Sequence, residues 1–152
     1  MDKADLTKFL IEARKNTYAS SGGKVEPVFP GSEQLEYKKD NWLYRDIFNI
    51  GNGIFMGLET VYFEDKPVLS VSYYGNFKSI TEEETDNILR KALMENSDTV
   101  RLWNDVEWTS GNYKYTCTID APGSIDEFTG SESITKDGKQ VYFFFYAGGF
   151  IG

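Results

Sequence analysis

Two glutamates occupy positions in which a carboxylate needs a partner. Glu59 lies in the strand-like run 53–63 and Glu132 in the run 127–136, each on a face that strand alternation makes mostly apolar. Burial raises the pKa of a carboxyl group unless a donor stabilises its charge. The candidate donors are Arg45, Lys66, Lys139 and the tyrosine hydroxyls. Each glutamate is interpreted either as one half of an internal ion pair or hydrogen bond, or as an anchor for a polar or cationic ligand.

Aromatic side chains with polar tips accompany these glutamates. Their rings suit stacking on a nucleobase, sugar or quaternary amine, and plain packing is the alternative. Arg45 and Asp46 are two charged residues within an aromatic strand. Their presence is explained if they pair with each other or if the strand lies at an edge of the sheet. The candidate ligand-binding residues are Trp42, Tyr44, Arg45, Glu59, Tyr73, Tyr74, Glu132 and Tyr146. Tyr18, followed by Ser21-Gly22-Gly23, is a candidate lid.

Several chemistries are excluded by composition. The sequence has no histidine, which removes Ser-His-Asp and Cys-His nucleophile systems and histidine-based metal sites. One cysteine, Cys117, excludes an internal disulfide and a cysteine-based zinc site, and we expect it to be buried as a small hydrophobe. We therefore predict no catalytic residues, no metal and no cofactor. An enzyme built on carboxylates and tyrosines remains a lesser alternative.

The charge of the chain limits its partners. The formal net charge is −8 at pH 7, so nucleic acid is not expected as a partner and a basic protein is favoured. The sequence has no signal-peptide pattern and no apolar run of transmembrane length, which predicts a cytoplasmic protein that does not enter a membrane.

Periodicity predicts an α+β fold. Apolar residues at helical spacing indicate a helix over 5–17, and Thr81 followed by three glutamates indicates the start of a second helix that fades near 96–98. Residues 24–33 are expected to be irregular. Strands are predicted over 42–48, 53–63, 68–76, 99–108, 112–119, 127–136 and 139–148, with a break at Ala121-Pro122-Gly123 and a type I′ hairpin turn at Asp137-Gly138.

An internal repeat accompanies this pattern. Eight identities recur at an offset of 73 residues and include Phe55 with Phe128, Gly57 with Gly130, Glu59 with Glu132, and Tyr73 with Tyr146. We predict a single domain over 1–152 that arose by duplication, with halves of about 1–78 and 79–152. Two α-β-β-β units would form a six- to eight-stranded antiparallel sheet with two helices packed on one face.

Both faces of this sheet carry apolar residues. Two helices cover about 20 Å of a sheet about 29 Å wide, which leaves apolar surface to be covered by a loop, a homodimer contact or a ligand. We expect an aromatic, acidic pocket on the face opposite the helices.

Three motifs carry a resemblance to a known family: Trp42-Leu43-Tyr44-Arg45-Asp46, Phe55-Met56-Gly57-Leu58-Glu59, and Lys66-Pro67-Val68 through Tyr73-Tyr74-Gly75. In these the chain resembles a bacterial family of unknown function, a small domain sometimes fused behind an Xre-type helix-turn-helix. The resemblance implies architecture and, through the fused relatives, a sensor. The leading hypothesis is a non-enzymatic small-molecule-binding or sensing domain; the alternative is an acidic protein-interaction or inhibitor module.

Overall fold

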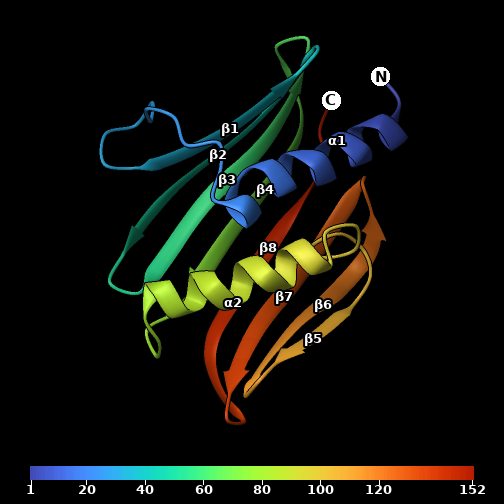
Figure 1. Cartoon of the computed structure of the whole chain (residues 1–152). Coiled ribbons are helices and arrows are strands. Elements are labelled where there is room, and N and C mark those ends of the chain that lie inside the picture. Colours follow the sequence, from blue (N-terminus) through green and yellow to red (C-terminus); the bar gives the residue numbers. More distant parts are fainter.

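The computed structural model describes residues 1–120 and 123–152. Over these residues the chain forms two α-helices, one short 3-10 helix and eight strands (Figure 1). The elements are α1 (Lys3–Asn16), η1 (Tyr18–Ser20), β1 (Glu33–Lys39), β2 (Trp42–Gly51), β3 (Ile54–Phe63), β4 (Lys66–Asn76), α2 (Glu82–Glu95), β5 (Val106–Ser110), β6 (Tyr113–Ser124), β7 (Glu127–Lys136) and β8 (Lys139–Phe150).

The strands pair antiparallel in one sheet, in the order β1-β2-β3-β4-β8-β7-β6-β5. Each half of the chain therefore contributes a helix followed by four consecutive strands. The last strands of the two halves, β4 and β8, pair at the centre, from Leu69 opposite Phe150 to Asn76 opposite Phe143. The α+β class and the antiparallel sheet are confirmed. The duplication of one ancestral unit stays a prediction.

Both helices begin at a residue that caps the first turn. The Asp2 side chain accepts a hydrogen bond from the amide of Ala4 at 3.1 Å, and the Thr81 hydroxyl accepts one from the amide of Glu84 at 3.1 Å. Glu84 does not reach back to complete a capping box. Its carboxylate instead accepts hydrogen bonds from Lys136 and Tyr113, which fastens the start of α2 to the sheet.

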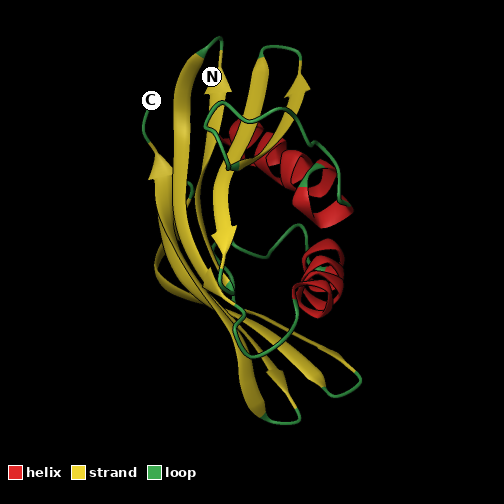
Figure 2. Ribbon diagram, turned by 90° about the vertical axis from the view of Figure 1, so that its left-hand side faces the viewer, coloured by secondary structure: helices red, strands yellow, loops and turns green.

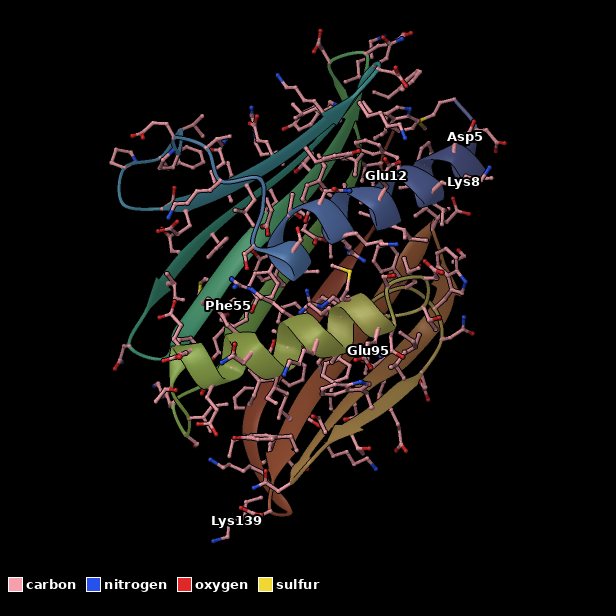
Figure 3. All side chains as sticks on the ribbon, viewed as in Figure 1. Asp5, Lys8, Glu12, Phe55, Glu95 and Lys139 are labelled. Carbon is pink, nitrogen blue, oxygen red and sulfur yellow. The ribbon has the colours of Figure 1, made fainter. Side chains whose placement is uncertain are left out.

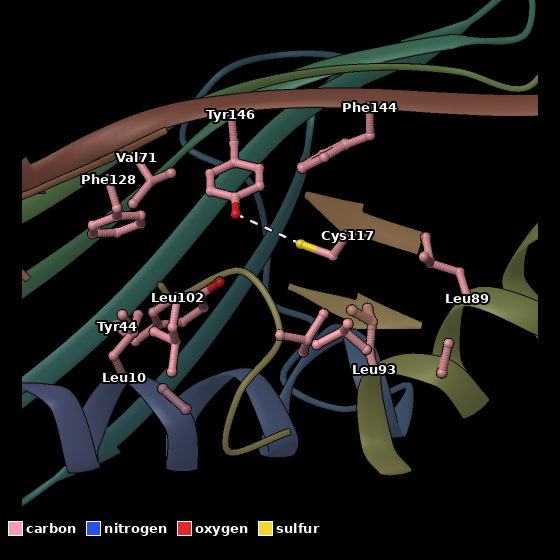
Figure 4. Close-up of a cluster of buried hydrophobic side chains, with 14 of the residues drawn as sticks. Leu10, Tyr44, Val71, Leu89, Leu93, Leu102, Cys117, Phe128, Phe144 and Tyr146 are labelled. Atoms are coloured by element: carbon pink, nitrogen blue, oxygen red, sulfur yellow. Dashed lines mark hydrogen bonds between the residues drawn. The ribbon is translucent and has the colours of Figure 1, made fainter. Parts of the chain in front are cut away.

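The two helices lie side by side on the same face of the curved sheet (Figure 2). We call this the inner face and the opposite one the outer face. The apolar stripes that the periodicity predicted are buried: Leu6, Phe9, Leu10 and Ala13 on α1, and Ile88, Leu89, Ala92 and Leu93 on α2. Thr85 of α2 is buried beside them. Together with inner-face aromatics these stripes form the hydrophobic core, part of which is drawn in Figure 4.

The outer face has strongly exposed apolar side chains near its middle. Met56, Leu58 and Phe145 are 50%, 47% and 53% exposed there. Tyr74 lies between Met56 and Phe145 in a cross-strand row. Towards β6 and β7 this face carries serine and threonine, among them Thr116, which is hydrogen-bonded to Ser133 at 2.7 Å. The outer face is thus an exposed apolar patch with a polar surround.

Some predicted element boundaries were wrong. The structure adds β1 to the three strands predicted for the first half, whereas the second half has four strands, as many as its predicted segments. The predicted strand at 99–108 begins only at Val106. The hairpin at Asp137 and Gly138 is confirmed, with φ of 50° and 78° as a type I′ turn requires. The predicted break at Ala121 and Pro122 falls outside the described residues.

Candidate functional site

A cavity of about 90 Å³ lies between the inner face and the helices. Its walls come from the C-terminal end of α1, from η1, from α2 with the loop that follows it, and from β2, β3, β4 and β8. Three lining residues, Lys15, Ile50 and Glu82, are exposed and mark where the cavity opens to solvent. Phe55, another lining residue, is labelled in Figure 3 close to the N-terminal end of α2.

Three aromatic rings form part of the cavity wall. The ring centroids of Phe55, Tyr73 and Phe144 lie 5.5–6.0 Å from one another. They come from β3, β4 and β8, so the central strands of both halves contribute. The guanidinium of Arg101 lies 4.3 Å from the centroid of Phe144. The wall therefore combines aromatic faces with nearby fixed charge.

Glu59 is held in the cavity wall by an arginine and a tyrosine. Arg14 of α1 donates from Nη2 to Oε2 at 2.6 Å and from Nε to Oε1 at 3.2 Å, and Tyr44 donates to Oε1 at 2.7 Å. Burial acts to raise the pKa of Glu59, but the charge and hydrogen bonds of Arg14 outweigh it and hold that pKa below its usual value. Glu59 is therefore an ionised, fully occupied carboxylate.

Asp46 is a lining carboxylate that no arginine contacts. It lies opposite Glu59 across β2 and β3 and is 7% exposed. Tyr73 donates to its Oδ1 at 2.6 Å; within the part of the chain that the structure describes, no donor reaches Oδ2. Burial, and after it the charge of Glu59, raises the pKa of Asp46 to about 7. Asp46 therefore presents one unpaired oxygen in the cavity wall and changes its charge near neutral pH.

A glycine makes room for the tyrosine that holds Asp46. A methyl group at Gly57 would lie 2.6 Å from the Tyr73 hydroxyl and 2.5 Å from the Ile47 carbonyl oxygen. Both contacts are closer than carbon atoms tolerate, so any side chain there would displace the hydroxyl. Gly130 has the same relation to the hydroxyl of Tyr146 in the second half.

The second half holds a matching cluster around Glu132. Arg101 donates from Nε to Oε2 at 2.6 Å and from Nη2 to Oε1 at 2.7 Å. Tyr115 also donates to Oε2, and Tyr142 donates to Oε1 at 3.4 Å. Because Glu59 and Glu132 each bind their own arginine, neither offers the open carboxylate that an acid–base pair requires.

The two clusters differ in the residue that lies opposite the glutamate, and Glu132 has an additional tyrosine donor, Tyr142. Cys117 lies opposite Glu132 on β6 and β7, as Asp46 lies opposite Glu59. The Tyr146 hydroxyl and the Cys117 Sγ are hydrogen-bonded at 3.6 Å (Figure 4). Neither of these two residues lines the cavity. The carboxylate is thus found in the half where there is space for a ligand, and the buried thiol in the other half.

An arginine links the clusters to each other. Arg14 donates from Nη1 to the backbone oxygen of Arg101 at 3.0 Å. Arg101 has a φ of 56°, an uncommon value for a residue with a side chain. This contact fixes the loop after α2 against α1.

A set of polar contacts between η1 and α2 closes one side of the cavity; we call it the gate. Tyr18 donates to Asp86 Oδ1 at 2.6 Å, and Arg90 donates to the Ser21 hydroxyl at 2.6 Å. The Arg90 guanidinium also lies 4.9 Å from the Tyr18 ring centroid. Tyr18 and Asp86 both line the cavity, so the sequence-based suggestion that Tyr18 covers a pocket agrees with its position.

The structure brings together three of the eight predicted ligand-binding residues. Tyr44, Glu59 and Tyr73 line the cavity. They lie on the helix-covered face, so the predicted pocket opposite the helices is wrong in its placement. Alternation along a strand shows which residues share a face, but it does not show which face the helices take.

The other five predicted residues lie elsewhere. Trp42 stacks on Phe9 at 5.2 Å in the core. Arg45 and Tyr74 belong to the outer face, where Arg45 pairs with Glu36 at 2.7 Å. The two residues of the second half, Glu132 and Tyr146, are buried in their own cluster. None of the five lines the cavity.

The donors of the glutamates were predicted only in part. The tyrosine hydroxyls are confirmed as partners, whereas Arg45 bonds Glu36 and Lys139 lies at the tip of the β7–β8 hairpin (Figure 3). The arginines that do bind, Arg14 and Arg101, were missed. No local signal marks them, because one lies on the polar side of an amphipathic helix and the other in a loop.

Neither a cluster of metal ligands nor a membrane-spanning helix is found among the described residues. They bring together no group of three potential metal ligands. Nor does any helix among residues 1–120 and 123–152 have the length and apolarity needed to cross a membrane.

Comparisons with known proteins give a family and no activity. No curated protein matches the chain, and no solved structure does. The model of one family, described as Domain of unknown function (DUF5680), matches residues 46–151. The match takes in Asp46, Glu59, Tyr73 and Arg101, and it begins after α1 and Arg14. The chain therefore belongs to the DUF5680 family of domains of unknown function.

Proposed function

We propose that this protein is a non-enzymatic binding or sensing domain that takes a small, mainly apolar molecule into the cavity between its helices and its sheet. The observation that carries the proposal is a solvent-connected cavity with aromatic walls and one buried, half-paired carboxylate, Asp46. Ligand pockets typically combine an apolar lining with a few polar groups that fix orientation. We place the protein in the bacterial cytoplasm, on the basis of its composition and its family resemblance.

The first experiment asks whether the cavity binds anything. The native protein is heated with a panel of small neutral, cationic and anionic organic molecules, each no larger than a substituted benzene ring. A ligand at about 100 times its Kd stabilises the folded state by about 2.7 kcal/mol, which raises Tm by several degrees.

Replacing each of two alanines by phenylalanine shows where the ligand binds. Ala19→Phe fills the cavity from η1, whereas Ala147→Phe adds the same ring to the exposed outer face. The proposal expects the ligand-induced rise in Tm to disappear in Ala19→Phe and to persist in Ala147→Phe. A panel without any binder, or a rise that survives in Ala19→Phe, would overturn it.

A second candidate function is an acidic protein-interaction module. The exposed patch of Met56, Leu58 and Phe145 favours it, since such patches mark interfaces, and the net charge of −8 favours a basic protein as the partner. A complex of this kind should weaken with salt and with Leu58→Lys. Loss of the complex in Ala19→Phe instead would contradict this candidate.

A further inference from the structure

We infer that the ligand carries a protonated amine that binds Oδ2 of Asp46, with its apolar part against the rings of Phe55, Tyr73 and Phe144. This inference rests on the proposed function and names the chemical class of the ligand. It is argued from hydrogen-bond geometry, from the charges in the cavity wall and from the aromatic wall.

The hydrogen-bond geometry leaves one acceptor open. Tyr73 occupies Oδ1 of Asp46, and among residues 1–120 and 123–152 nothing donates to Oδ2. Oδ2 is not among the described side-chain atoms that are fully enclosed without a partner, so a ligand can reach it. An ammonium group has only donors, so it supplies what this oxygen lacks.

The charges of the cavity wall favour a cation. Arg14 is neutralised by Glu59, and Arg101 by Glu132. At the gate Asp86 pairs with Arg90 at 3.3 Å. Asp46 is not in an ion pair with any described residue, so the buried part of the wall has an excess of negative charge when Asp46 is ionised. An anionic ligand would have to compete with Glu59 and Glu132 for their arginines.

The aromatic wall suits the rest of such a ligand. Tyr73 both holds Asp46 and presents its ring to the cavity, 6.0 Å from Phe55 and 5.5 Å from Phe144. Aromatic faces attract a nearby cation and also bury apolar carbon. A molecule with an ammonium group one or two bonds from a small apolar body therefore makes both kinds of contact.

The test uses three probes of one shape and different charge: benzylammonium, benzyl alcohol and benzoate. Binding is measured by calorimetry at pH 8 to the native protein, to Asp46→Asn and to Asp126→Asn. Asp126→Asn is the matched control, because it removes the same charge from an exposed carboxylate that pairs with Lys3 away from the cavity.

We expect benzylammonium to bind the native protein and Asp126→Asn at least tenfold more tightly than benzyl alcohol does. Asp46→Asn should lose that preference and still bind benzyl alcohol. Equal binding of all three probes to the native protein would overturn the amine inference and leave the cavity proposal standing. Tightest binding of benzoate would overturn it in favour of the arginines. Binding of no probe to any variant would count against the proposed function itself.

A second measurement needs only the native protein. As the pH falls below about 7, protonation of Asp46 should weaken benzylammonium binding by up to about tenfold per pH unit and leave benzyl alcohol unaffected. The groups around Asp46 keep their charge state over this range, because Glu59 has a lowered pKa, Tyr44 and Tyr73 have raised ones, and arginines stay protonated. These surrounding groups are Tyr44, Glu59 and Tyr73 of the sheet, Arg14 of α1, and Arg101 after α2. Benzylammonium binding that does not change between pH 8 and pH 6 would overturn the inference.

Discussion

Asp46 and Glu59 face each other on neighbouring strands, yet their environments stabilise opposite charge states. Glu59 receives two hydrogen bonds from Arg14 and one from Tyr44, which favours the ionised form. Asp46 receives one from Tyr73 and feels the negative charge of Glu59. Two nearby carboxylates with separated pKa values are typical of functional sites.

The raised pKa of Asp46 predicts how the stability of the folded protein changes with pH. Between about pH 4, where an aspartate titrates in the unfolded chain, and about pH 7, the folded protein binds one more proton than the unfolded chain. Rising pH therefore destabilises the folded state by up to about 1.4 kcal/mol per pH unit through this group. Asp46→Asn lacks this effect. The difference between its free energy of unfolding and that of the native protein, both measured with urea, should therefore shift in favour of the variant from pH 4 to pH 7.

The same experiment contains its own comparison. Glu59 has a lowered pKa, so its contribution to stability is lost only as the pH falls below about 4.5, and it is lost in both proteins. Parallel pH profiles for native protein and Asp46→Asn over pH 4–7 would show that Asp46 titrates normally.

A second prediction concerns the hydrogen bond from the Tyr73 hydroxyl to Asp46. Its hydrogen bond lowers the pKa of Asp46, so Tyr73→Phe should move the titration of Asp46 to higher pH and weaken binding of benzylammonium at pH 7. Tyr146→Phe removes the matching hydroxyl in the second half, away from the cavity. Carboxyl-carbon NMR follows the titration. A similar shift in both variants would show that the effect is not local to the site.

At this scale the sequence revealed types of residue but few partners. The glutamates could be identified because strand alternation puts them on apolar faces. Their arginines could not, because Arg14 and Arg101 are 45 and 31 positions away from the carboxylates they bind. The sequence marked Asp46 as a charge within an aromatic strand, and an ion pair with Arg45 was one expected explanation. The Arg45 side chain lies on the outer face instead.

Among the elements, η1 and α2 decide access to the cavity. The gate joins them through the polar contacts of Tyr18, Asp86 and Arg90, and the Tyr18 ring also packs against the core. A region held mainly by side-chain hydrogen bonds opens at a lower free energy than the packed core does. We therefore expect opening of the gate to widen the access that the exposed residues Lys15, Ile50 and Glu82 mark.

A variant of the gate tests this role. Tyr18→Phe removes the hydrogen bond to Asp86, which should cost about 1.5–3 kcal/mol of stability and speed both association and dissociation of benzylammonium. Tyr113→Phe removes an analogous hydrogen bond to Glu84 of the same helix, outside the cavity. Stopped-flow kinetics should show faster exchange in Tyr18→Phe alone. Unchanged rates in that variant would mean that ligand enters elsewhere.

The elements were predicted best where their signals are local. The start of α2 at Thr81, the amphipathic stripes and the Asp137-Gly138 turn depend on neighbouring residues, and these were right. The strand β1 was missed because Gln34, Glu36 and Lys38 make its sequence polar, which is common in an edge strand.

The whole molecule is tied together across its two halves. Arg14 binds Glu59 of the first half with one side of its guanidinium and the backbone of Arg101 with the other. Arg101 in turn binds Glu132 of the second half. The ion pairs therefore form one connected network under the helices.

This network predicts coupled mutations. Glu59→Gln and Glu132→Gln each leave a buried arginine without its countercharge, which should cost about 3–5 kcal/mol. Because Arg14 contacts Arg101, the double variant should depart from additivity by at least 0.5 kcal/mol, within the usual range of about 0.5–3. Urea unfolding of the four proteins measures the coupling. Strict additivity would show that the halves are stabilised independently.

The predicted class, the antiparallel sheet and the helix-covered face are confirmed for the whole molecule, but the space for a ligand was assigned to the wrong face. Counting helix widths against sheet width assumed that the helices fill their own side. The structure shows a cavity between the helices and the curved sheet (Figure 2). Such spacing depends on tertiary packing, which periodicity does not encode.

A crystal structure of the protein soaked with benzylammonium tests the central claim most directly. The account predicts the ring against Phe55 and Phe144, and the nitrogen about 2.7–2.9 Å from Oδ2 of Asp46. A ligand bound on the outer face, or an empty cavity at saturating benzylammonium, would contradict it.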